Sequence, residues 1–584
     1  MINGYSKNKS VQLLVALLIE NGIKKVIISP GTTNLEFTAA LQYNGGFELF
    51  SAIDERSAAY MACGMASISG EVIAITCTEA TASRDYFPGI TEAYYRKLPI
   101  LTITGVHKYS YVGNLMPQVI DRSISPKDTF TYKVQLPIIK DQEDYYHTIF
   151  EINKALLELK RNGGGPVHID LPCCDNNYDF SETELPRVKT VKRYYCGDTL
   201  PSIRAEKVAI FIGNHKNFDE KTTLLIEKFC GQYNAVVFCD HTSGYYGKYA
   251  IHAGVLSFQS CEYDIFKQID LLIHLGETTG DEPTQKRLIG AQTIWRVCSD
   301  GELRNTFGKL DCVFQMDEKT FFSNYDIQVE KVCSYYLTCK MAVDEMKINE
   351  NILPFSNAYV AAKFTNAIPD GSSVYLGVSN TIRSWTLFSF KNKVKTYSNV
   401  GCRGIDGILS SAVGVSLVNS QELTFCVIGD LMFFYDMNAI GNRDITNNLR
   451  VIVINNNGGG VFKLDGAPGY RFFGETDTDK YIAAANHFNP CSKSVIKNYV
   501  ESLGFKYISA NTKEELNIVI NDFCSKESES PILLEVFTNS EDDRVALRNI
   551  RAIKASKLEH LKQKAKGVIG EKGISIARNV FKKL

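Results

Sequence analysis

The stretch VIGDLMFFYDMNAIGNRDITNNLRVIVINNNGGGVF, residues 427–462, decides how the rest of the chain is interpreted. An apolar strand is predicted over residues 424–428 and ends at Gly429-Asp430. A second buried strand over residues 451–454 runs into three asparagines and three glycines, residues 455–460. In open α/β sheets, ligands bind where strands end. We therefore expect the two polar clusters to share one binding site.

The residue types in these clusters indicate which ligands the site takes. Asp430 offers a carboxylate oxygen and Asn457 an amide oxygen, the hard ligands that Mg²⁺ or Ca²⁺ prefers. The glycines at 458–460 let the backbone approach a ligand closely. The alternative is two strand ends with ordinary Asn/Gly turn chemistry. Because each motif closes a buried strand, we favour a site for a divalent ion and a diphosphate.

The spacing of the two motifs resembles that of a known enzyme family. Asp430 precedes Asn457 by 27 residues, as in the diphosphate and metal motif of thiamine-diphosphate (ThDP) enzymes. The finer pattern GDL-x-F-x-x-D-x-N … NNNGGG-x-F resembles the menaquinone-pathway SEPHCHC synthases, which join 2-oxoglutarate to isochorismate. The resemblance implies that Asp430, Asn457 and the Gly459 carbonyl hold Mg²⁺ against the ThDP diphosphate. The cofactor-binding residues that it implies are Gly429, Asp430, Leu431, Asn455, Asn457, Gly459 and Gly460.

Bulk composition narrows the class of protein. The chain has 584 residues, 45% of them hydrophobic, which is ordinary for a globular protein with a large core. A net charge of −1 gives no electrostatic case for nucleic acid as a partner. The 16 cysteines are scattered, without a C-x-x-C pair or a Cys/His cluster at zinc spacing. No signal peptide and no apolar run of about eighteen residues is present, so we expect a cytoplasmic enzyme.

Strand and helix patterns alternate along the chain and predict an α/β protein with three doubly wound parallel sheets. Besides the two strands above, we expect strands over residues 25–29, 47–53, 72–78, 99–105, 167–171, 208–212, 236–239, 271–275, 293–296, 373–376 and 532–537. By resemblance, which covers about residues 10–540, residues 1–185 form a pyrimidine-binding domain. Residues 186–345 then form a Rossmann-like middle domain and residues 346–540 a diphosphate-binding domain. Residues 541–584 form a basic helical extension beyond the family pattern. Within it, residues 551–584 are rich in lysine, with apolar residues at helical intervals, and we expect a solvated surface helix there; docking on a partner or an anionic membrane surface is the alternative.

Three residues outside the diphosphate motif are candidates for catalysis. Glu55 lies between a buried strand and a helix of small residues; taken alone, it is an acid near a helix N-terminus. The resemblance instead implies that Glu55 hydrogen-bonds the pyrimidine ring of ThDP. It also implies that Ile405, a stiff apolar side chain, wedges between the cofactor rings, and that Gln118 faces the reaction centre. The alternatives are a buried helix-start isoleucine and a loop glutamine.

The family's substrate arginines are not all kept. SEPHCHC synthases carry arginines that bind substrate carboxylates, and three of those positions hold Thr33, His107 and Val400 here. Each bidentate arginine–carboxylate contact is a strong polar interaction. The loss of three such contacts argues against isochorismate as the acceptor.

Other substrate positions keep polar or cationic residues. Ser379 and Arg383 are retained, and Arg403 is an additional cation nearby in sequence. The candidate substrate residues are therefore Thr33, His107, Ser379, Arg383 and Arg403. We expect a ThDP- and Mg²⁺-dependent carboligase that decarboxylates a 2-oxoacid such as pyruvate and transfers the fragment to an acceptor other than isochorismate.

Three alternatives stay open at the level of sequence. One is a genuine SEPHCHC synthase with rearranged arginines, and another is a simple 2-oxoacid decarboxylase. The third is a ThDP fold used as a binding subunit, against which the intact Glu55, Asp430 and Asn457 speak. Because the family's active site lies between two chains, the resemblance implies a homodimer or homotetramer.

Overall fold

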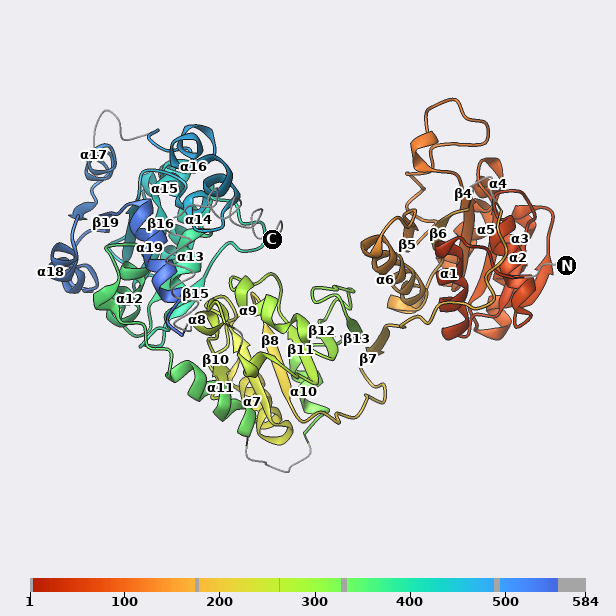
Figure 1. Cartoon of the computed structure of the whole chain (residues 1–584), viewed down its shortest axis with the longest axis horizontal. Helices are drawn as coiled ribbons and strands as arrows, with labels where there is room; N and C mark the ends of the chain where they lie inside the picture. The colour runs from red at the N-terminus through yellow and green to blue at the C-terminus, as the bar shows by residue number, and fades with distance from the viewer. Residues whose placement is uncertain (1–3, 174–177, 262, 327–332, 488–493, 555–584) are drawn as a thin grey trace, which may run out of the picture. The chain divides into compact units, whose positions relative to one another are not determined.

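The computed structural model of the protein describes residues 4–173, 178–261, 263–326, 333–487 and 494–554 (Figure 1). Three sheets, of six, seven and six strands, follow one another along the chain, with helices between the strands. The chain divides into two compact units. The first comprises Met1–Tyr194, Gly301–Thr306 and Leu310–Val313, and the second comprises Tyr195–Asp300, Phe307–Lys309 and Phe314–Leu584.

The first sheet has the strand order β2-β1-β3-β4-β6-β5, and every pair in it is parallel. Its strands are β1 (Lys25–Ile28), β2 (Glu48–Ser51), β3 (Ile73–Thr78), β4 (Ile100–Val106), β5 (Tyr132–Gln135) and β6 (Val167–Pro172). The helices are α1 (Lys9–Glu20), α2 (Leu35–Asn44), α3 (Glu55–Ser69), α4 (Thr81–Asp85), α5 (Phe87–Arg96) and α6 (Gln142–Glu158).

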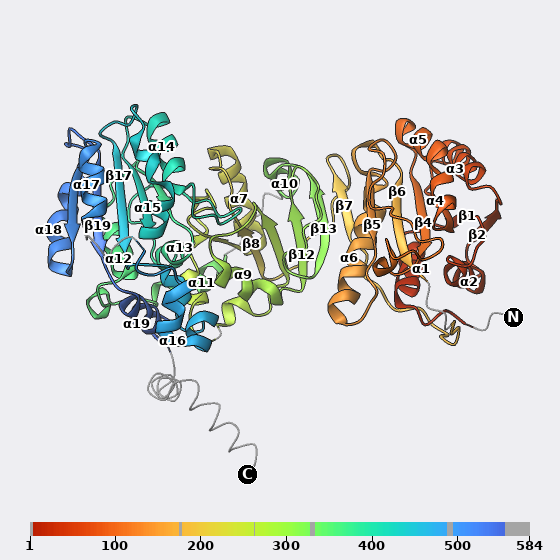
Figure 2. The same ribbon diagram turned by 90° about the horizontal axis from the view of Figure 1, so that it is seen from above.

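Both faces of this sheet are covered. Val26 and Ile28 of β1 pack into the core under α1 and α6, whereas Ile27 packs into the core under α3 and α5. Successive residues of a strand point to opposite faces, so a continuous apolar run fills both cores. Figure 2 shows α1 and α6 on one side of the sheet and α3 and α5 on the other. This arrangement is the doubly wound pattern that the sequence predicts.

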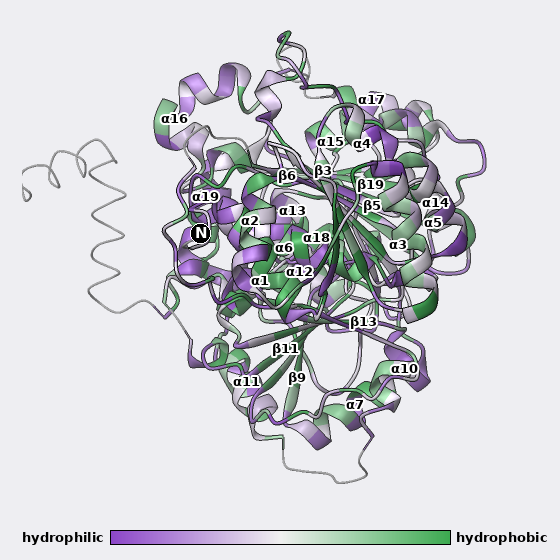
Figure 3. Cartoon of the chain, turned by 90° about the vertical axis from the view of Figure 1, so that its right-hand side faces the viewer, coloured by the Kyte–Doolittle hydropathy of each residue, from purple (hydrophilic) through white to green (hydrophobic). Residues whose placement is uncertain are grey.

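The middle sheet has the order β10-β9-β8-β11-β12-β13-β7. Its strands are β7 (Lys192–Tyr195), β8 (Val208–Ile212), β9 (Ala235–Cys239), β10 (Ala250–Ile251), β11 (Leu271–Leu275), β12 (Thr293–Val297) and β13 (Leu310–Gln315). Helices α7 (Glu220–Tyr233), α8 (Gly254–Ser257), α9 (Glu282–Arg287), α10 (Glu318–Ser323) and α11 (Ser334–Asp344) accompany it. Strands β8, β9 and β11 are buried along their whole length, and Figure 3 colours β9 and β11 as hydrophobic.

The third sheet has the order β15-β14-β16-β17-β19-β18 and is also parallel. Its strands are β14 (Ser373–Leu376), β15 (Lys395–Tyr397), β16 (Thr424–Gly429), β17 (Leu449–Asn455), β18 (Lys506–Ala510) and β19 (Ile532–Phe537). Its helices are α12 (Asn357–Ala367), α13 (Asn380–Trp385), α14 (Ile408–Val418), α15 (Asp430–Asp436), α16 (Pro468–Tyr481), α17 (Val495–Ser502), α18 (Lys513–Phe523) and α19 (Ser540–Arg551). Gly429 of β16 lies opposite Ile454 of β17, so the two polar motifs leave the sheet at the same edge.

The start of the predicted C-terminal extension is part of the folded core. Helix α19 buries Asp543, Ala546, Leu547 and Ile550 and packs against α12. Its first turn is acidic and its last turn basic, which complements the helix dipole. The solvated helix is predicted from Arg551 onward, and Arg551 is the last residue of α19. The lysine-rich remainder, 555–584, lies outside the described residues.

The three-sheet α/β architecture predicted from the sequence is confirmed. The strands that the sequence missed include β5, β7, β10 and β18, which lie at sheet edges. The burial of β5, β7 and β18 is partial, so none of them has the continuous apolar run of a central strand. The predicted domain boundaries stay predictions. Among the described residues, no helix combines the length and apolar character needed to cross a bilayer.

Candidate active site

Asp430 is a buried carboxylate at the edge where β16 ends. It is the first residue of α15 and is 5% exposed. Among the residues that the structure describes, no cation forms an ion pair with it. Burial raises the pKa of Asp430 to about 7, while the backbone amides of Leu431 and Gly458 oppose that rise. A buried carboxylate that lacks a counter-ion is well suited to receive a metal cation.

Asn457 and Gly458 form a tight turn directly after β17. Asn457 has a left-handed backbone with φ of +63°, and its N–H donates to Asn455 Oδ1 at 3.1 Å. Its side-chain amide nitrogen donates to Asn486 Oδ1, which leaves the amide oxygen as the group to offer a cation. Gly458 has φ of +150°, and a Cβ there would lie 3.0 Å from Ala485 Cα. Any side chain at 458 would therefore strain and crowd the turn.

A buried glutamate supports the root of this turn from the neighbouring strand. Asn455 Nδ2 donates to Glu535 Oε1 of β19 at 2.6 Å, and the Tyr507 hydroxyl donates to Glu535 Oε2 at 2.9 Å. Burial raises the pKa of Glu535, and the two donors oppose that rise. Asn455 is thus committed to a structural bond, which holds the Asn-Asn-Asn segment in place.

A second buried carboxylate, Asp543 of α19, ties two loops of the same edge together. It accepts hydrogen bonds from Asn456 Nδ2 (3.0 Å), Asn380 Nδ2 (3.1 Å) and the Asn357 backbone N–H (2.7 Å). Burial raises its pKa to about 6, and the asparagine donors oppose the rise. Sequence reasoning missed Asp543, because nothing in the acidic start of α19 shows that it reaches a loop 87 residues earlier.

These residues fit the group that the motif implies. Asp430 follows β16, and Asn457 and Gly459 follow β17 at the same edge of the sheet, where they would offer carboxylate, amide and carbonyl oxygens to a metal. The described residues contain no cluster of three His, Cys, Asp or Glu side chains at metal distance. A metal at this edge would therefore use amide and carbonyl oxygens beside one carboxylate. Gly429 and Leu431 flank Asp430 in the chain, and Gly460 follows Gly459 in the second motif.

A pocket of about 130 Å³ lies in the second unit, beside the loops that follow β11 and β14. Arg383 of α13 lines it, and burial lowers the pKa of this guanidinium while Glu282 opposes the change. Arg403 also lines the pocket, forms an ion pair with Glu282, and donates to the Thr279 carbonyl at 3.1 Å. Ser379, with φ of +64°, completes the polar lining. The structure thus brings together the three substrate candidates Ser379, Arg383 and Arg403.

The middle sheet contributes to this pocket through a buried aspartate. Asp240, at the end of β9, accepts from Thr279 Oγ1 (2.6 Å), the Gly280 N–H (2.8 Å) and the Asp281 N–H (3.0 Å). These bonds fold the 279–281 loop into the shape that presents Glu282 to Arg403. The sequence analysis did not assign Glu282, because no motif marks it.

Ile405 lies in the loop between β15 and α14. Its side chain is half-buried and packs against the core cluster under α14 and α15. It is neither fully exposed nor a fully buried helix-start residue, so its predicted contact with a cofactor stays a prediction.

In the first unit, the candidate residues follow the carboxyl ends of three parallel strands of the first sheet, β1, β2 and β4. Glu55 opens α3 after β2 and is half-buried. Thr33 follows β1 and is 2% exposed; a Cβ on Gly105 would lie 2.1 Å from the Thr33 carbonyl, so β4 and this loop touch backbone to backbone. His107 follows β4, and Gln118 lies exposed in the next loop with φ of +67°. The roles predicted for these four residues stay predictions.

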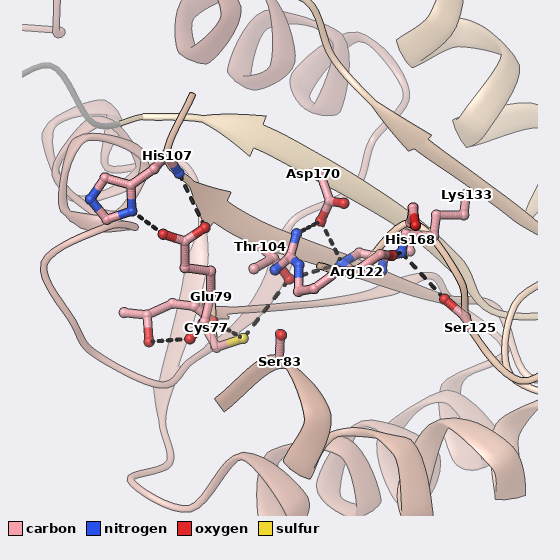
Figure 4. Close-up of polar contacts among 12 residues, drawn as sticks. Cys77, Glu79, Ser83, Thr104, His107, Arg122, Ser125, Lys133, His168 and Asp170 are labelled. Atoms are coloured by element: carbon pink, nitrogen blue, oxygen red, sulfur yellow. Dashed lines mark hydrogen bonds and ion pairs between the residues drawn. The ribbon is translucent and has the colours of Figure 1, made fainter. Parts of the chain in front are cut away.

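His107 forms a pair with a buried carboxylate. Its ring Nδ1 and its backbone N–H both bond to Glu79, which follows β3 and is 6% exposed (Figure 4). The position that holds an arginine in the SEPHCHC pattern is thus a histidine in this chain, and that histidine is paired with Glu79. Glu79 was not singled out from the sequence, because the pairing requires β3 and β4 to be neighbours.

Comparisons with known proteins identify the class. Residues 8–125 match the family described as "Thiamine pyrophosphate enzyme, N-terminal TPP binding domain", and residues 378–536 match its C-terminal TPP binding domain; thiamine pyrophosphate is another name for ThDP. The chain belongs to the ThDP-dependent enzymes, and within them to the SEPHCHC synthase branch.

The relatives that define this branch cover almost the whole chain. A 2-succinyl-5-enolpyruvyl-6-hydroxy-3-cyclohexene-1-carboxylate (SEPHCHC) synthase of Bacteroides thetaiotaomicron is 30% identical over 93% of this chain and 98% of its own length. A SEPHCHC synthase of Phocaeicola vulgatus is 28% identical over the same shares of the two chains. A third, from Christiangramia forsetii, is 29% identical over 94% of this chain and all of its own length.

The prediction of an acceptor other than isochorismate is wrong in the light of these relatives, which all carry the SEPHCHC synthase name. The prediction counted arginines at three sequence positions. Cations at a site are set by three-dimensional placement instead: Arg403 enters the pocket beside Arg383 although it stands at none of those positions. The loss of an arginine from a motif therefore does not measure the charge of the site.

Proposed function

We propose that the protein is a SEPHCHC synthase that uses ThDP and Mg²⁺. The reaction consumes 2-oxoglutarate, isochorismate and one proton, and yields SEPHCHC and carbon dioxide. The observation that carries the proposal is similarity to SEPHCHC synthases over 93% of the chain, with both cofactor motifs intact. The wider description, a decarboxylating carboligase that acts on a 2-oxoacid, follows from the same proposal.

ThDP, when bound, supplies the electron sink that lets the 2-oxoacid lose carbon dioxide. Asp430, Asn457 and the Gly459 carbonyl would hold Mg²⁺ and the diphosphate at the edge of the third sheet. Glu55 would share a proton with the pyrimidine ring, and Ile405 would shape the cofactor from its apolar side. The remaining task of the protein is to bind two anionic substrates and to keep water out.

Substrate carboxylates would be bound in the pocket of the second unit. Arg383 is partly desolvated there, so an anion that pairs with it interacts in a medium of low polarity. Arg403 is already oriented by Glu282 and the Thr279 carbonyl, which lowers the entropy cost of using it. Ser379 adds a hydroxyl donor. These groups support recognition of a dicarboxylate donor such as 2-oxoglutarate.

We propose that the active protein is a homodimer or a dimer of dimers. The support is the apolar surface of α3 and the residues before it: Ile53 is 87% exposed and Ile68 is 92% exposed. A second copy would bury such side chains and would complete the surroundings of the half-buried Glu55. Sedimentation velocity on the purified protein tests this; a monomer at micromolar concentration would contradict it.

The test of the function is product formation. Purified protein with ThDP and Mg²⁺ is given 2-oxoglutarate or pyruvate, each with and without isochorismate, and carbon dioxide and SEPHCHC are measured. We expect release from 2-oxoglutarate that depends on isochorismate, with equimolar SEPHCHC. Release from 2-oxoglutarate alone, without SEPHCHC, would instead indicate a simple decarboxylase.

A matched variant separates catalysis from cofactor binding. Glu55→Gln should abolish turnover and leave ThDP binding, measured by calorimetry, close to that of the wild type. Unchanged turnover in this variant would remove Glu55 from the proposed mechanism.

A further inference from the structure

The loop after β4, residues 107–122, contains Gln118 and lies at the carboxyl edge of the first sheet. We call it the Gln118 loop. Its middle is exposed: Leu115 is 98% and Met116 43% exposed. Its backbone hydrogen bonds run within the loop, as from the Asn114 N–H to the Tyr111 carbonyl (3.0 Å) and from the Val119 N–H to the Met116 carbonyl (3.3 Å). A loop of this kind takes its position from the points at which its ends are attached.

At one end, the attachment is the pair of His107 and Glu79 described above. At the other end, Arg122 Nη2 forms an ion pair with Asp170 Oδ1 on β6 (Figure 4). The Arg122 side chain is 10% exposed and that of Asp170 is 4% exposed. Both ends of the Gln118 loop are therefore fastened to carboxylates that the core of the unit buries.

Further groups stabilise the Arg122 end. Lys133 Nζ, on β5, donates to the Arg122 carbonyl and to Ser125 Oγ, the latter at 3.3 Å. Arg84 Nη2 donates to the Asp121 carbonyl at 3.0 Å. Two further cations, Lys133 and Arg84, thus hold the chain at residues 121, 122 and 125, shortly after Gln118.

The charge balance around Asp170 makes this attachment hard to release. His168 lies beside Asp170, with Nε2 3.2 Å from Asp170 Oδ1 and 2.8 Å from Thr104 Oγ1. Burial lowers the pKa of His168 to about 4, so its ring is neutral near pH 7 and does not compensate the carboxylate. If the loop moved away, Asp170 would lose its ion pair with Arg122 while remaining buried, which is strongly unfavourable.

We propose that Arg122 is a positioning residue: its ion pair with Asp170 sets the place of the Gln118 loop and thereby of Gln118, the side chain that is predicted to face the substrates. This inference rests on the proposed function for its kinetic consequence, but the attachment itself can be tested without substrate. Arg122 acts through the loop and is not itself expected to touch substrate.

The variants are chosen so that a folded protein is obtained. Arg122→Met/Asp170→Asn removes both charges and leaves no buried carboxylate unpaired. Arg122→Lys keeps the charge but loses the planar fork. The control is Arg193→Met, which breaks another buried ion pair of the same unit, between Arg193 Nη2 and Glu158 Oε1 at 2.8 Å. That pair holds neither end of the Gln118 loop.

The first readout is hydrogen–deuterium exchange of the substrate-free protein, followed peptide by peptide. In the double variant we expect the amides of residues 109–121 to exchange at least about tenfold faster, with the strands of the first sheet unchanged. Arg122→Lys should restore part of the protection. Arg193→Met should lower the melting temperature without changing exchange in the loop.

The second readout is kinetic. We expect kcat/KM for isochorismate to fall by about ten- to a hundredfold in the double variant, because a misplaced positioning group costs that order of rate. The control should keep the wild-type value per folded molecule. Loop exchange equal to that of the wild type, or faster exchange spread evenly over the sheet, would overturn the positioning role. A wild-type protein that forms no SEPHCHC would instead refute the proposed function. The hydrogen–deuterium exchange of the loop would then test the positioning role of Arg122 by itself.

Discussion

Asp281 offers a stringent test of the electrostatics at the pocket. It caps α9, accepting from the Thr284 N–H at 3.1 Å and from the Thr284 hydroxyl, and it is 3% exposed. Burial raises its pKa to about 7, and the Thr284 bonds oppose that rise. Asp281→Asn keeps the shape: its oxygen can accept from the Thr284 N–H and its nitrogen can donate to Thr284 Oγ1. The Thr284 hydroxyl hydrogen then points to Ser257 Oγ, 2.8 Å away.

The sign and size of the effect follow from the pKa. A carboxyl whose folded-state pKa is raised stabilises the fold fully below its unfolded pKa, and that stability is lost as the pH rises through the folded value. A rise from 3.8 to about 7 corresponds to about 4 kcal/mol lost by pH 8, of which about 1 kcal/mol is lost by pH 4.5. The asparagine variant does not ionise and keeps this stability.

The assay is calorimetric melting of cofactor-free wild type and variant at pH 4.5, 6 and 8. We expect the variant to melt higher, by a margin that grows with pH, at about 2–4 °C per kcal/mol for a domain of 150–250 residues. Asp219→Asn is the control, because Asp219 also caps a helix, α7, yet the Thr222 amide lowers its pKa. There the difference in melting temperature between variant and wild type should stay nearly constant from pH 4.5 to 8, because a carboxyl with a lowered pKa loses its stabilising effect only below the unfolded value of 3.8. A constant margin for Asp281→Asn, or a variant that melts lower at pH 8, would refute the reasoning.

Other substitutions probe the remaining parts of the site. Asp430→Ala should abolish Mg²⁺-dependent ThDP binding in calorimetry while the protein stays folded, and retention of the wild-type affinity would remove Asp430 from the metal site. Arg403→Met should raise the KM for 2-oxoglutarate about ten- to a hundredfold with a smaller change in kcat, since a charge-assisted contact contributes about 1.5–3 kcal/mol; an unchanged KM would exclude Arg403 from substrate binding. Gly105→Ala should destabilise the first unit by about 1–3 kcal/mol in denaturant titration, because its Cβ would lie 2.1 Å from the Thr33 carbonyl; wild-type stability would show that the loop yields freely.

Much of the fold could be predicted because each central strand has a recognisable apolar pattern in its own short stretch of sequence. Strands β8 and β11 were predicted at the residues where they occur, since each is a short apolar run bounded by turn residues. The same holds for β14 and β19. Edge strands such as β5 and β18 were missed, because one side of each faces solvent and their composition is mixed.

The edge of the third sheet at which the two polar motifs meet could be predicted for a related reason. Asp430 and Asn457 stand directly after two buried strands, and parallel neighbours bring their carboxyl ends together. The substrate side could not be predicted in this way. Counting arginines at motif positions led to the wrong acceptor, because Arg403 reaches the pocket from a loop and its partner Glu282 stands at the start of α9, 121 residues earlier.

The sequence by itself determined the class of enzyme, the three parallel sheets and the sheet edge at which the two polar motifs meet. These follow from apolar periodicity and from motifs only a few residues long. Only the tertiary structure decided which buried carboxylates organise the site: Asp543 behind Asn456, Glu79 behind His107, and Asp170 behind Arg122. The physical reason is that a buried charge needs a partner, and folding brings that partner from strands and helices tens of residues away, a distance over which local pattern carries no information.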